Sequence, residues 1–198
     1  MTASLRFPSR TARRILVAAL IAPLIAPATD AVAQRTHEHG AARLDVSVDA
    51  QTLTIRLESP LDNLVGFESA PKSEQQRTTV RRMAERFHRP QDLFQPTAAA
   101  ACTPGSVSLA SLAIPAALRA APGAPVPAAD PLPAVAGKGH ADLEVDITFR
   151  CARPQALDGL EVRLFDAFPL LRRIDAGVVT AKGQSGTRLS RGRSALSW

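Results

Sequence analysis

The chain has 198 residues, and its 24 basic and 18 acidic side chains give a formal net charge of +6 at pH 7. Four of the arginines and one aspartate lie in residues 1–33, so the remaining 165 residues carry a net charge of only +3. Aromatic residues make up 4% of the chain and tyrosine is absent. Neither a strongly basic face nor an aromatic stacking surface is expected, which argues against nucleic-acid binding.

Residues 1–33 have the order of a secretory signal peptide. Four arginines precede the apolar run Ile15–Ala26, and the small residues Ala31 and Ala33 stand at the two positions that signal peptidase reads. The apolar run is shorter than a membrane span and is interrupted by proline. We therefore predict cleavage after Ala33 and a single periplasmic domain over residues 34–198, with no membrane insertion after cleavage.

The chain has two cysteines, Cys102 and Cys151. In an exported protein, two cysteines favour one disulfide. A bond between them would close a loop of about 50 residues and contribute roughly 4 kcal/mol by restricting the unfolded chain. The alternative is a pair of thiolate metal ligands, which requires a reducing compartment or a metal that binds before oxidation.

The first regular segments are Ala42–Asp49 and Thr52–Ser59, which both alternate apolar with polar residues. Alternation with a period of two is typical of a strand that is buried on one face. A short turn separates the two segments, so we predict an antiparallel hairpin.

A helix is predicted over Ser73–His88. It begins with a serine suited to cap a helix, and Pro90 follows its end. Residues at helical spacing place one apolar stripe on it, formed by Val80, Met83, Ala84 and Phe87.

Residues 103–139 contain seven of the chain's 16 prolines, many alanines and no histidine. This composition predicts a flexible insert, in which Ser106–Ile114 is a candidate strand. Alternation resumes in His140–Cys151, Leu160–Phe165 and Arg172–Ala181. We predict an α+β fold with an antiparallel β-sheet of about six or seven strands, one main helix and the long Ala/Pro-rich insert.

His37 and His39 stand two positions apart, directly before the first strand. Side chains two residues apart point the same way in an extended segment, so two imidazoles can share one Zn²⁺ or Cu²⁺. His140 opens a later strand in the same manner. If the two strands are neighbours in matching register, the three histidines converge, and Glu38, Asp142 or a water completes the site. The alternative is a polar lead into each strand, with no metal.

Signatures of catalysis are missing from the sequence. It has no GxSxG, HExxH or CxxC motif and no phosphate-binding glycine loop. The acidic residues near the strand ends alternate with apolar residues, as solvent-facing positions do. We therefore expect no enzyme. The alternative to a metal-binding protein is an interaction module that presents apolar loops around Phe67 and Phe168 to an envelope partner.

Three pieces of sequence point to a known family. They are the opening HxHG-x-A-x-L, the segment SPLDNLVGFE, and a run that begins with FRC and continues through LFxxFP. In these pieces the chain resembles the ZrgA-like periplasmic proteins, which are linked to zinc uptake. The resemblance extends over nearly all of residues 34–198, apart from the insert.

The resemblance implies a non-catalytic zinc-binding accessory protein for import across the inner membrane, with a zinc ABC transporter or its binding protein as partner. It places His37 and His39 on the family's N-terminal histidines, and Cys102 and Cys151 on its cysteine pair. The chain departs from the family pattern in the insert, which lacks histidine, and at Ser69, where relatives often carry histidine after GFE. Both departures lower the expected capacity for zinc.

Overall fold

A computed structural model of the chain describes residues 38–125 and 141–198. Contacts divide the chain into residues 1–35 and residues 36–198, and every described residue belongs to the second unit. The predicted signal peptide, His37, His140 and the last part of the predicted insert lie outside the described residues.

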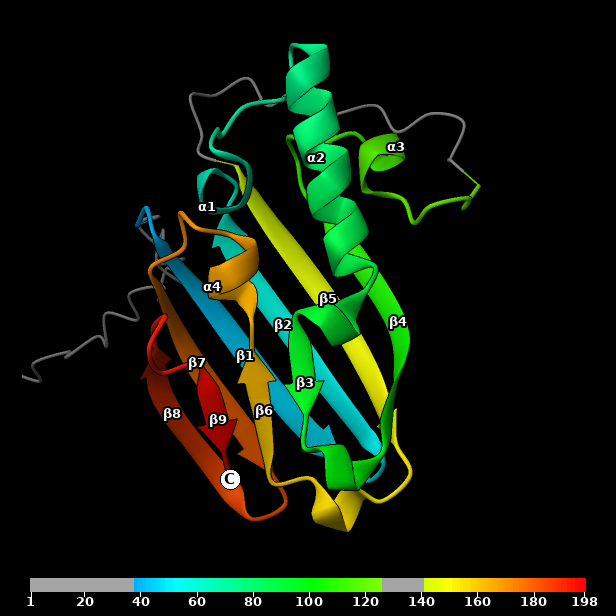
Figure 1. Cartoon of the computed structure of the whole chain (residues 1–198), viewed down its shortest axis with the longest axis vertical. Coiled ribbons are helices and arrows are strands. Elements are labelled where there is room, and N and C mark those ends of the chain that lie inside the picture. Colours follow the sequence, from blue (N-terminus) through cyan, green and yellow to red (C-terminus); the bar gives the residue numbers. More distant parts are fainter. Residues whose placement is uncertain (1–37, 126–140) are drawn as a thin grey trace, which may run out of the picture. The chain divides into compact units, whose positions relative to one another are not determined.

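The larger sheet has six strands in the order β4-β5-β2-β1-β7-β8 (Figure 1). The strands are β1 (Ala41–Asp49), β2 (Thr52–Pro60), β4 (Cys102–Ala110), β5 (Asp142–Cys151), β7 (Arg173–Thr180) and β8 (Gly183–Leu189). The predicted hairpin is confirmed, because β1 and β2 pair in antiparallel register. All ladders in this sheet are antiparallel except that of β1 with β7, which is parallel.

A smaller sheet has three strands in the order β3-β6-β9. They are β3 (Phe94–Pro96), β6 (Gly159–Val162) and β9 (Ala195–Ser197). The described residues therefore form nine strands in two sheets. The six strands of the larger sheet agree with the predicted sheet of about six or seven, and the smaller sheet was not predicted. The predicted strand Leu160–Phe165 is shorter than expected because its end turns into a helix at Leu164.

Helix α2 (Glu74–Phe87) begins directly after the predicted serine cap. The Ser73 hydroxyl accepts a hydrogen bond from the backbone N–H of Gln76, and the Gln76 side chain accepts one from the backbone N–H of Ser73. Such a cap is worth about 1 kcal/mol. The buried residues of the helix are the predicted stripe, Val80, Met83, Ala84 and Phe87. The predicted main helix is thus confirmed.

Short helical turns connect the other elements. They are α1 (Asp62–Val65), α3 (Ala116–Arg119), α4 (Leu164–Ala167), η1 (Pro90–Asp92), η2 (Ala98–Ala100) and η3 (Pro154–Ala156). Within residues 38–125 and 141–198, no helix has both the length and the apolar character needed to cross a membrane.

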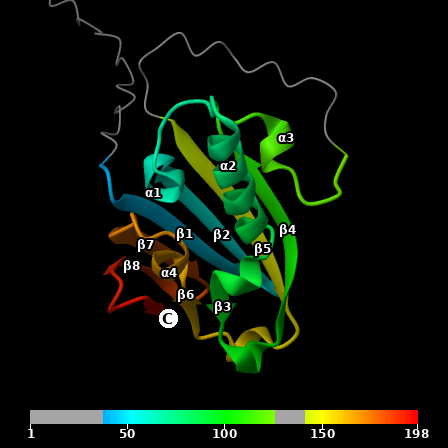
Figure 2. The same ribbon diagram turned by 45° about the horizontal axis from the view of Figure 1, so that its top comes forward.

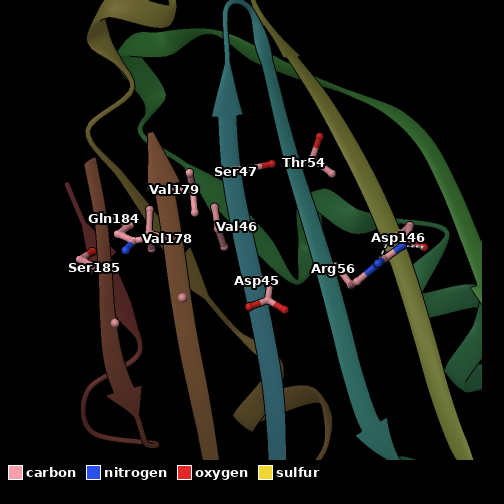
Figure 3. A pocket seen from close by; sticks show the side chains of 12 residues that line it. Asp45, Val46, Ser47, Thr54, Arg56, Asp146, Val178, Val179, Gln184 and Ser185 are labelled. Atoms are coloured by element: carbon pink, nitrogen blue, oxygen red, sulfur yellow. Dashed lines mark hydrogen bonds and ion pairs between the residues drawn. The ribbon is translucent and has the colours of Figure 1, made fainter. Parts of the chain in front are cut away.

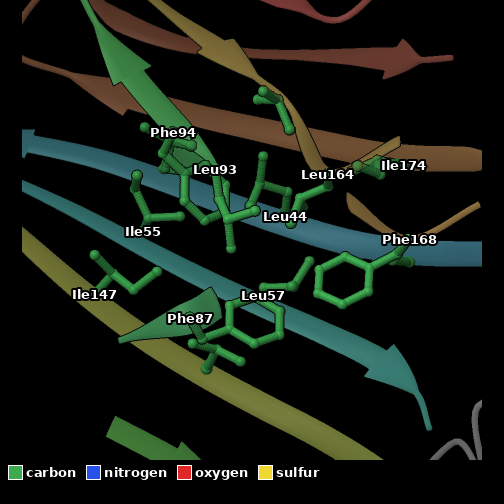
Figure 4. Close-up of a cluster of buried hydrophobic side chains, with 14 of the residues drawn as sticks. Leu44, Ile55, Leu57, Phe87, Leu93, Phe94, Ile147, Leu164, Phe168 and Ile174 are labelled. Carbon is green, nitrogen blue, oxygen red and sulfur yellow. The ribbon is translucent and has the colours of Figure 1, made fainter. Parts of the chain in front are cut away.

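The hydrophobic core lies between the larger sheet and a layer formed by α2 and the smaller sheet (Figures 1 and 2). Alternating residues of β1, β2 and β5 point into it, as Leu44, Ile55 and Ile147 do in Figure 4. The opposing layer contributes Phe87 and Phe94, which are fully buried. Burial of these apolar faces provides the main favourable free energy of folding.

Phe168 belongs to this core rather than to an exposed loop. Its side chain is 2% exposed, and its ring stacks on Phe87 with 5.3 Å between the ring centroids. The Arg86 guanidinium covers the ring at 5.8 Å from its centroid and donates to the carbonyl of Ala167. The Phe168 ring is therefore not available to an envelope partner, whereas Leu170 in the same loop is 49% exposed and Phe67 is only partly buried. The interaction module with apolar loops around Phe67 and Phe168 stays a prediction.

The predicted insert is partly regular structure. Its first residues form β4, an edge strand paired with β5, and a later stretch forms α3. The β4 residues Thr103–Ser106 are exposed and the β4–β5 register shifts between Pro104 and Val107. The candidate strand Ser106–Ile114 is thus confirmed in part, because β4 includes its first residues but begins earlier, at Cys102, in an exposed, bulged stretch without apolar alternation.

Cys102 and Cys151 form a disulfide between two directly opposed positions of β4 and β5. The disulfide expectation is thus confirmed, and the alternative of two thiolate metal ligands is excluded for this oxidised form. The bond joins the edge strand to the body of the larger sheet.

Replacement of both cysteines by serine should lower the free energy of unfolding by about 4 kcal/mol, because the unfolded chain regains the entropy of the open loop. Urea denaturation followed by circular dichroism measures the change. A reductant should destabilise the unmodified protein by a similar amount and leave the double serine variant unchanged. Equal stability of the two proteins without reductant would contradict a structural role for the bond.

Candidate functional site

The N-terminal histidine segment enters the larger sheet at the end where β1 begins, β2 ends and β5 begins (Figures 1 and 2). Glu58 of β2 is opposite both Arg43 of β1 and Glu144 of β5, so β1 and β5 begin level with each other. The predicted convergence of three histidines assumed that these two strands are direct neighbours. They are not, because β2 lies between them and separates them by about 10 Å.

His39 lies between two carboxylates at this end of the sheet. Its Nε2 is 2.7 Å from Oε1 of Glu68, and its Nδ1 is 3.7 Å from Oδ2 of Asp62. The side chain of His39 is 58% exposed, whereas those of Asp62 and Glu68 are 29% and 21% exposed. The imidazole is thus the outermost of the three groups, and the two acids lie behind it.

The turn after β2 brings Asp62 and Glu68 to the same imidazole. Asp62 begins the single helical turn α1. The backbone carbonyl of Asp62 accepts a hydrogen bond from the backbone N–H of Gly66. Gly66 has a φ of +82°, a left-handed conformation that ends the turn and reverses the chain. Glu68 follows two residues later and therefore faces His39.

The buried side chain of Asn63 fixes the backbone beside His39. Its Oδ1 accepts a hydrogen bond from the backbone N–H of Gly40 at 2.6 Å. Its Nδ2 donates to the carbonyl of Ala41 at 2.8 Å and to the hydroxyl of Ser59 at 3.1 Å. One amide thus joins α1 to the start of β1 and the end of β2.

Gly40 provides the second fixed point. Its φ is +82°, and a β-carbon at this position would lie 3.1 Å from Cδ of Arg172. Its carbonyl accepts hydrogen bonds from the backbone N–H groups of Arg172 and Arg173 at 2.8 and 2.9 Å. The glycine of the HxHG motif therefore has a structural role, because a side chain would be strained and crowded there.

Glu38, one of the expected additional ligands, binds an arginine instead. Both of its carboxylate oxygens contact the guanidinium of Arg173, at 3.1 and 2.8 Å. The hydrogen bond to Glu38, together with the charge of Asp175, raises the pKa of Arg173 above its ordinary value. The carboxylate of Glu38 is therefore directed toward β7, which contains Arg173.

The other predicted ligands are placed in part. Asp142 is opposite Pro60 at the start of β5, and Ala141 before it accepts a hydrogen bond from the backbone N–H of Leu61 at 2.8 Å. His140 directly precedes Ala141 in the sequence, but both it and His37 fall outside the described residues. Among the residues that the structure describes, no three His, Cys, Asp or Glu side chains form a ready metal-binding group.

A shallow hollow of about 740 Å³ lies elsewhere, on the face of the larger sheet opposite the core (Figure 3). It forms where Gly177 and Gly186 face each other on β7 and β8, beside Asp45. Its lining has no histidine or cysteine, and Arg56 is paired with Asp146 at 2.8 Å. The third charged group of the lining, Asp45, is paired with Arg43 at 2.7 Å, so the hollow presents no set of zinc ligands.

Sequence reasoning missed Asp62, Asn63 and Glu68 as parts of the site. The two acids resembled ordinary solvent-facing residues, and Asn63 resembled a residue that interrupts a strand. One signal was present, since these polar residues stand in the otherwise apolar segment Leu61–Phe67 and its immediate flank. Polar residues in a loop that packs on a sheet end are often retained for hydrogen bonding.

Replacement of Asn63 by alanine should lower the free energy of unfolding by roughly 3 kcal/mol, because three hydrogen bonds are lost and the buried N–H of Gly40 is left without an acceptor. Thermal or urea denaturation measures the change. Gln184→Ala is the matched control, since this amide is exposed on β8 and should change stability by less than about 0.5 kcal/mol. Equal effects of the two substitutions would contradict the role of Asn63.

Comparison with known proteins bears on the fold unit that carries this site. A search of curated proteins found no match. A family model described as "ZrgA family zinc uptake protein" matches residues 36–198, which are most of the chain. The match includes the histidine segment, both cysteines and the loop with Asp62 and Glu68, and it confirms the resemblance seen in the sequence. The chain belongs to the ZrgA family of zinc uptake proteins.

Proposed function

We propose that the protein is a periplasmic, non-catalytic accessory of zinc uptake that binds Zn²⁺ as cargo at the sheet end around His39. Membership of a zinc uptake family supports the metal and the process. The arrangement of His39 between Asp62 and Glu68 is the observation that carries the location.

Three histidines are the proposed nitrogen ligands: His37, His39 and His140. His39 is largely exposed, as a group that captures an ion from solvent must be. Glu38, the residue after His37, is adjacent to His39 in the chain. Ala141, the residue after His140, directly precedes β5 at the same end of the sheet. Imidazole nitrogens and carboxylate oxygens are common zinc ligands, and zinc needs no redox chemistry from its site.

The proposed compartment follows from the signal-like N-terminal sequence and from the disulfide. Disulfides persist in the periplasm and are rare where thiols are kept reduced. The recipient of the ion is proposed to be a zinc ABC transporter or its binding protein. A non-catalytic role is favoured by the lack of nucleophile and metalloprotease motifs in the sequence.

Calorimetric titration with Zn²⁺ of the protein purified from the periplasm tests this function. We expect a dissociation constant below about 100 µM, equivalent to more than about 5.5 kcal/mol of binding free energy. The double substitution His37→Ala/His39→Ala should abolish this binding, and His140→Ala should weaken it, because each removes nitrogen ligands.

His88→Gln is the matched control for loss of a histidine. His88 ends α2, and its Nε2 lies 2.8 Å from the carbonyl oxygen of Arg119, far along the chain from the proposed ligands. This variant should bind zinc as the unmodified protein does. Absence of binding in the unmodified protein, or equal binding by the double alanine variant, would overturn the proposed function.

A further inference from the structure

Strand β8 is an open edge of the larger sheet. It pairs with β7 on one side, and within the described ranges no strand pairs with its other side. Gln184 and Ser185 point to opposite faces of the sheet and both are exposed, so the described chain covers neither face of this half of β8 (Figure 3). An open edge strand presents backbone groups to which another extended chain can bind.

The register of the β7–β8 hairpin identifies the backbone groups that this edge presents. A two-residue turn joins Thr180 to Gly183, and these residues form the first pair of the ladder. The residues that flank such a turn exchange hydrogen bonds, and hydrogen-bonded pairs then alternate with non-hydrogen-bonded pairs. The N–H and C=O groups of Gln184, Gly186 and Arg188 therefore point away from β7.

The opposite edge of the larger sheet, β4, is closed to a further strand. Pro104 has no N–H group, and the register with β5 shifts directly after it. The Arg119 guanidinium donates to the carbonyl of Leu109, near the other end of β4. Proline, bulges and covered backbone groups are devices that prevent strand addition. Strand β8 has no proline, and its register with β7 is continuous over its whole length.

The shallow hollow on the outer face of the sheet lies directly beside this edge (Figure 3). Gly186 faces Gly177 across the ladder, and Val179, which is 54% exposed, also lines the hollow. A β-carbon at Gly186 would meet no atom closer than 3.7 Å, so packing within the described chain does not require a glycine there. Because neighbouring strands lie about 4.8 Å apart, a long apolar side chain on an added strand can cross Gly186 and enter the hollow.

The charge of this edge determines the kind of strand that it attracts. Residues 181–198 contain no acidic residue and four exposed basic residues: Lys182, Arg188, Arg191 and Arg193. Asp175 of β7 is 2.9 Å from Arg188 but also 3.2 Å from Arg173, so one carboxylate serves two guanidinium groups. Pairing with β8 of a second copy would bring two basic edges together, whereas an acidic segment would be attracted.

We propose that β8 is a docking edge for an extended, acidic segment of another protein, which adds to the larger sheet as a further strand. Backbone hydrogen bonds to Gln184, Gly186 and Arg188 provide the affinity. Selectivity comes from an apolar side chain that crosses Gly186 into the hollow and from flanking carboxylates that meet the basic side chains. This docking edge goes beyond the proposed zinc site and needs no metal.

An NMR titration of the full protein purified from the periplasm tests the proposal. The probe is the peptide Glu-Thr-Glu-Thr-Leu-Thr-Glu-Thr-Glu with blocked ends, which reads the same in both directions and therefore fits β8 in either orientation. We expect a dissociation constant below about 1 mM, with the largest amide shifts at Gln184, Gly186 and Arg188. Lysine in place of every glutamate, or serine in place of the leucine, should each weaken binding by about ten-fold or more.

Variants of the protein separate the backbone contribution from that of charge. Gly186→Pro removes an outward N–H but no hydrogen bond of the β7–β8 ladder, and it should abolish peptide binding. Gly186→Val keeps every backbone group but fills the approach to the hollow, and it should weaken binding by about ten-fold. Lys182→Gln/Arg193→Gln should weaken it by a similar factor. Lys72→Gln/Arg82→Gln is the matched control, because it removes two exposed charges elsewhere and should bind normally.

Circular dichroism confirms that each variant is folded, and Gly186→Val carries the test if the proline variant is not. The proposal is overturned if the acidic peptide shifts no amide of β8, if the lysine peptide binds as tightly, or if the folded Gly186 variants bind as the unmodified protein does. A dimer seen by analytical ultracentrifugation and lost on substitution of Gly186 would make a second copy the occupant, which also overturns it. Zn²⁺ is left out of every titration, so these results are independent of the proposed function.

Discussion

The side-chain amide of Asn63 determines where the histidine segment enters the sheet. It binds the backbone of Gly40 and Ala41 and the hydroxyl of Ser59, so one buried group joins the start of β1, the end of β2 and the turn α1. A buried amide whose donors and acceptor are all hydrogen-bonded is rigid. Breaking any one of these bonds leaves a buried polar atom with neither a protein partner nor water to bind. His39 is next to Gly40 and Asp62 is next to Asn63. The contact between imidazole and acid is therefore a consequence of this amide.

Much of the fold could be predicted because burial leaves a periodic mark. Alternation in β1, β2 and β5 and the stripe of α2 reflect one face packed on the core. The parallel partnership of β1 with β7 left no such mark, because alternation shows which face is buried but not which strand lies alongside. The β4 edge strand was predicted only in its later part, because the side chains of Thr103–Ser106 are exposed and show no apolar alternation.

The site could be predicted only in its histidines. Their spacing in an extended segment suggests shared ligation, and this inference needs no knowledge of the fold. The contacts of Asp62 and Glu68 with His39 join residues that are far apart in the sequence. They form only if the loop after β2 folds back on a segment more than twenty residues earlier. The sequence shows that these acids stand in and beside an apolar loop, but only the reversal at Gly66 brings them to one imidazole.

A zinc-uptake accessory must bind its ion and also release it. The proposed site is built at an exposed sheet end from nitrogen and oxygen ligands, without thiolates, because both cysteines form the disulfide. Closed thiolate sites hold structural zinc tightly, whereas open sites with histidine and carboxylate ligands keep a position accessible to solvent. In the proposed site, the core thus provides a rigid support, and the exposed imidazole of His39 provides the exchangeable part.

The most direct measurement is a crystal structure of the periplasmic protein soaked with Zn²⁺, with anomalous diffraction recorded on both sides of the zinc absorption edge. The account predicts an anomalous peak beside His39, with zinc about 2.1 Å from a nitrogen of its imidazole. A fully loaded crystal with no peak beside His39, or with its zinc held elsewhere on the molecule, would contradict it.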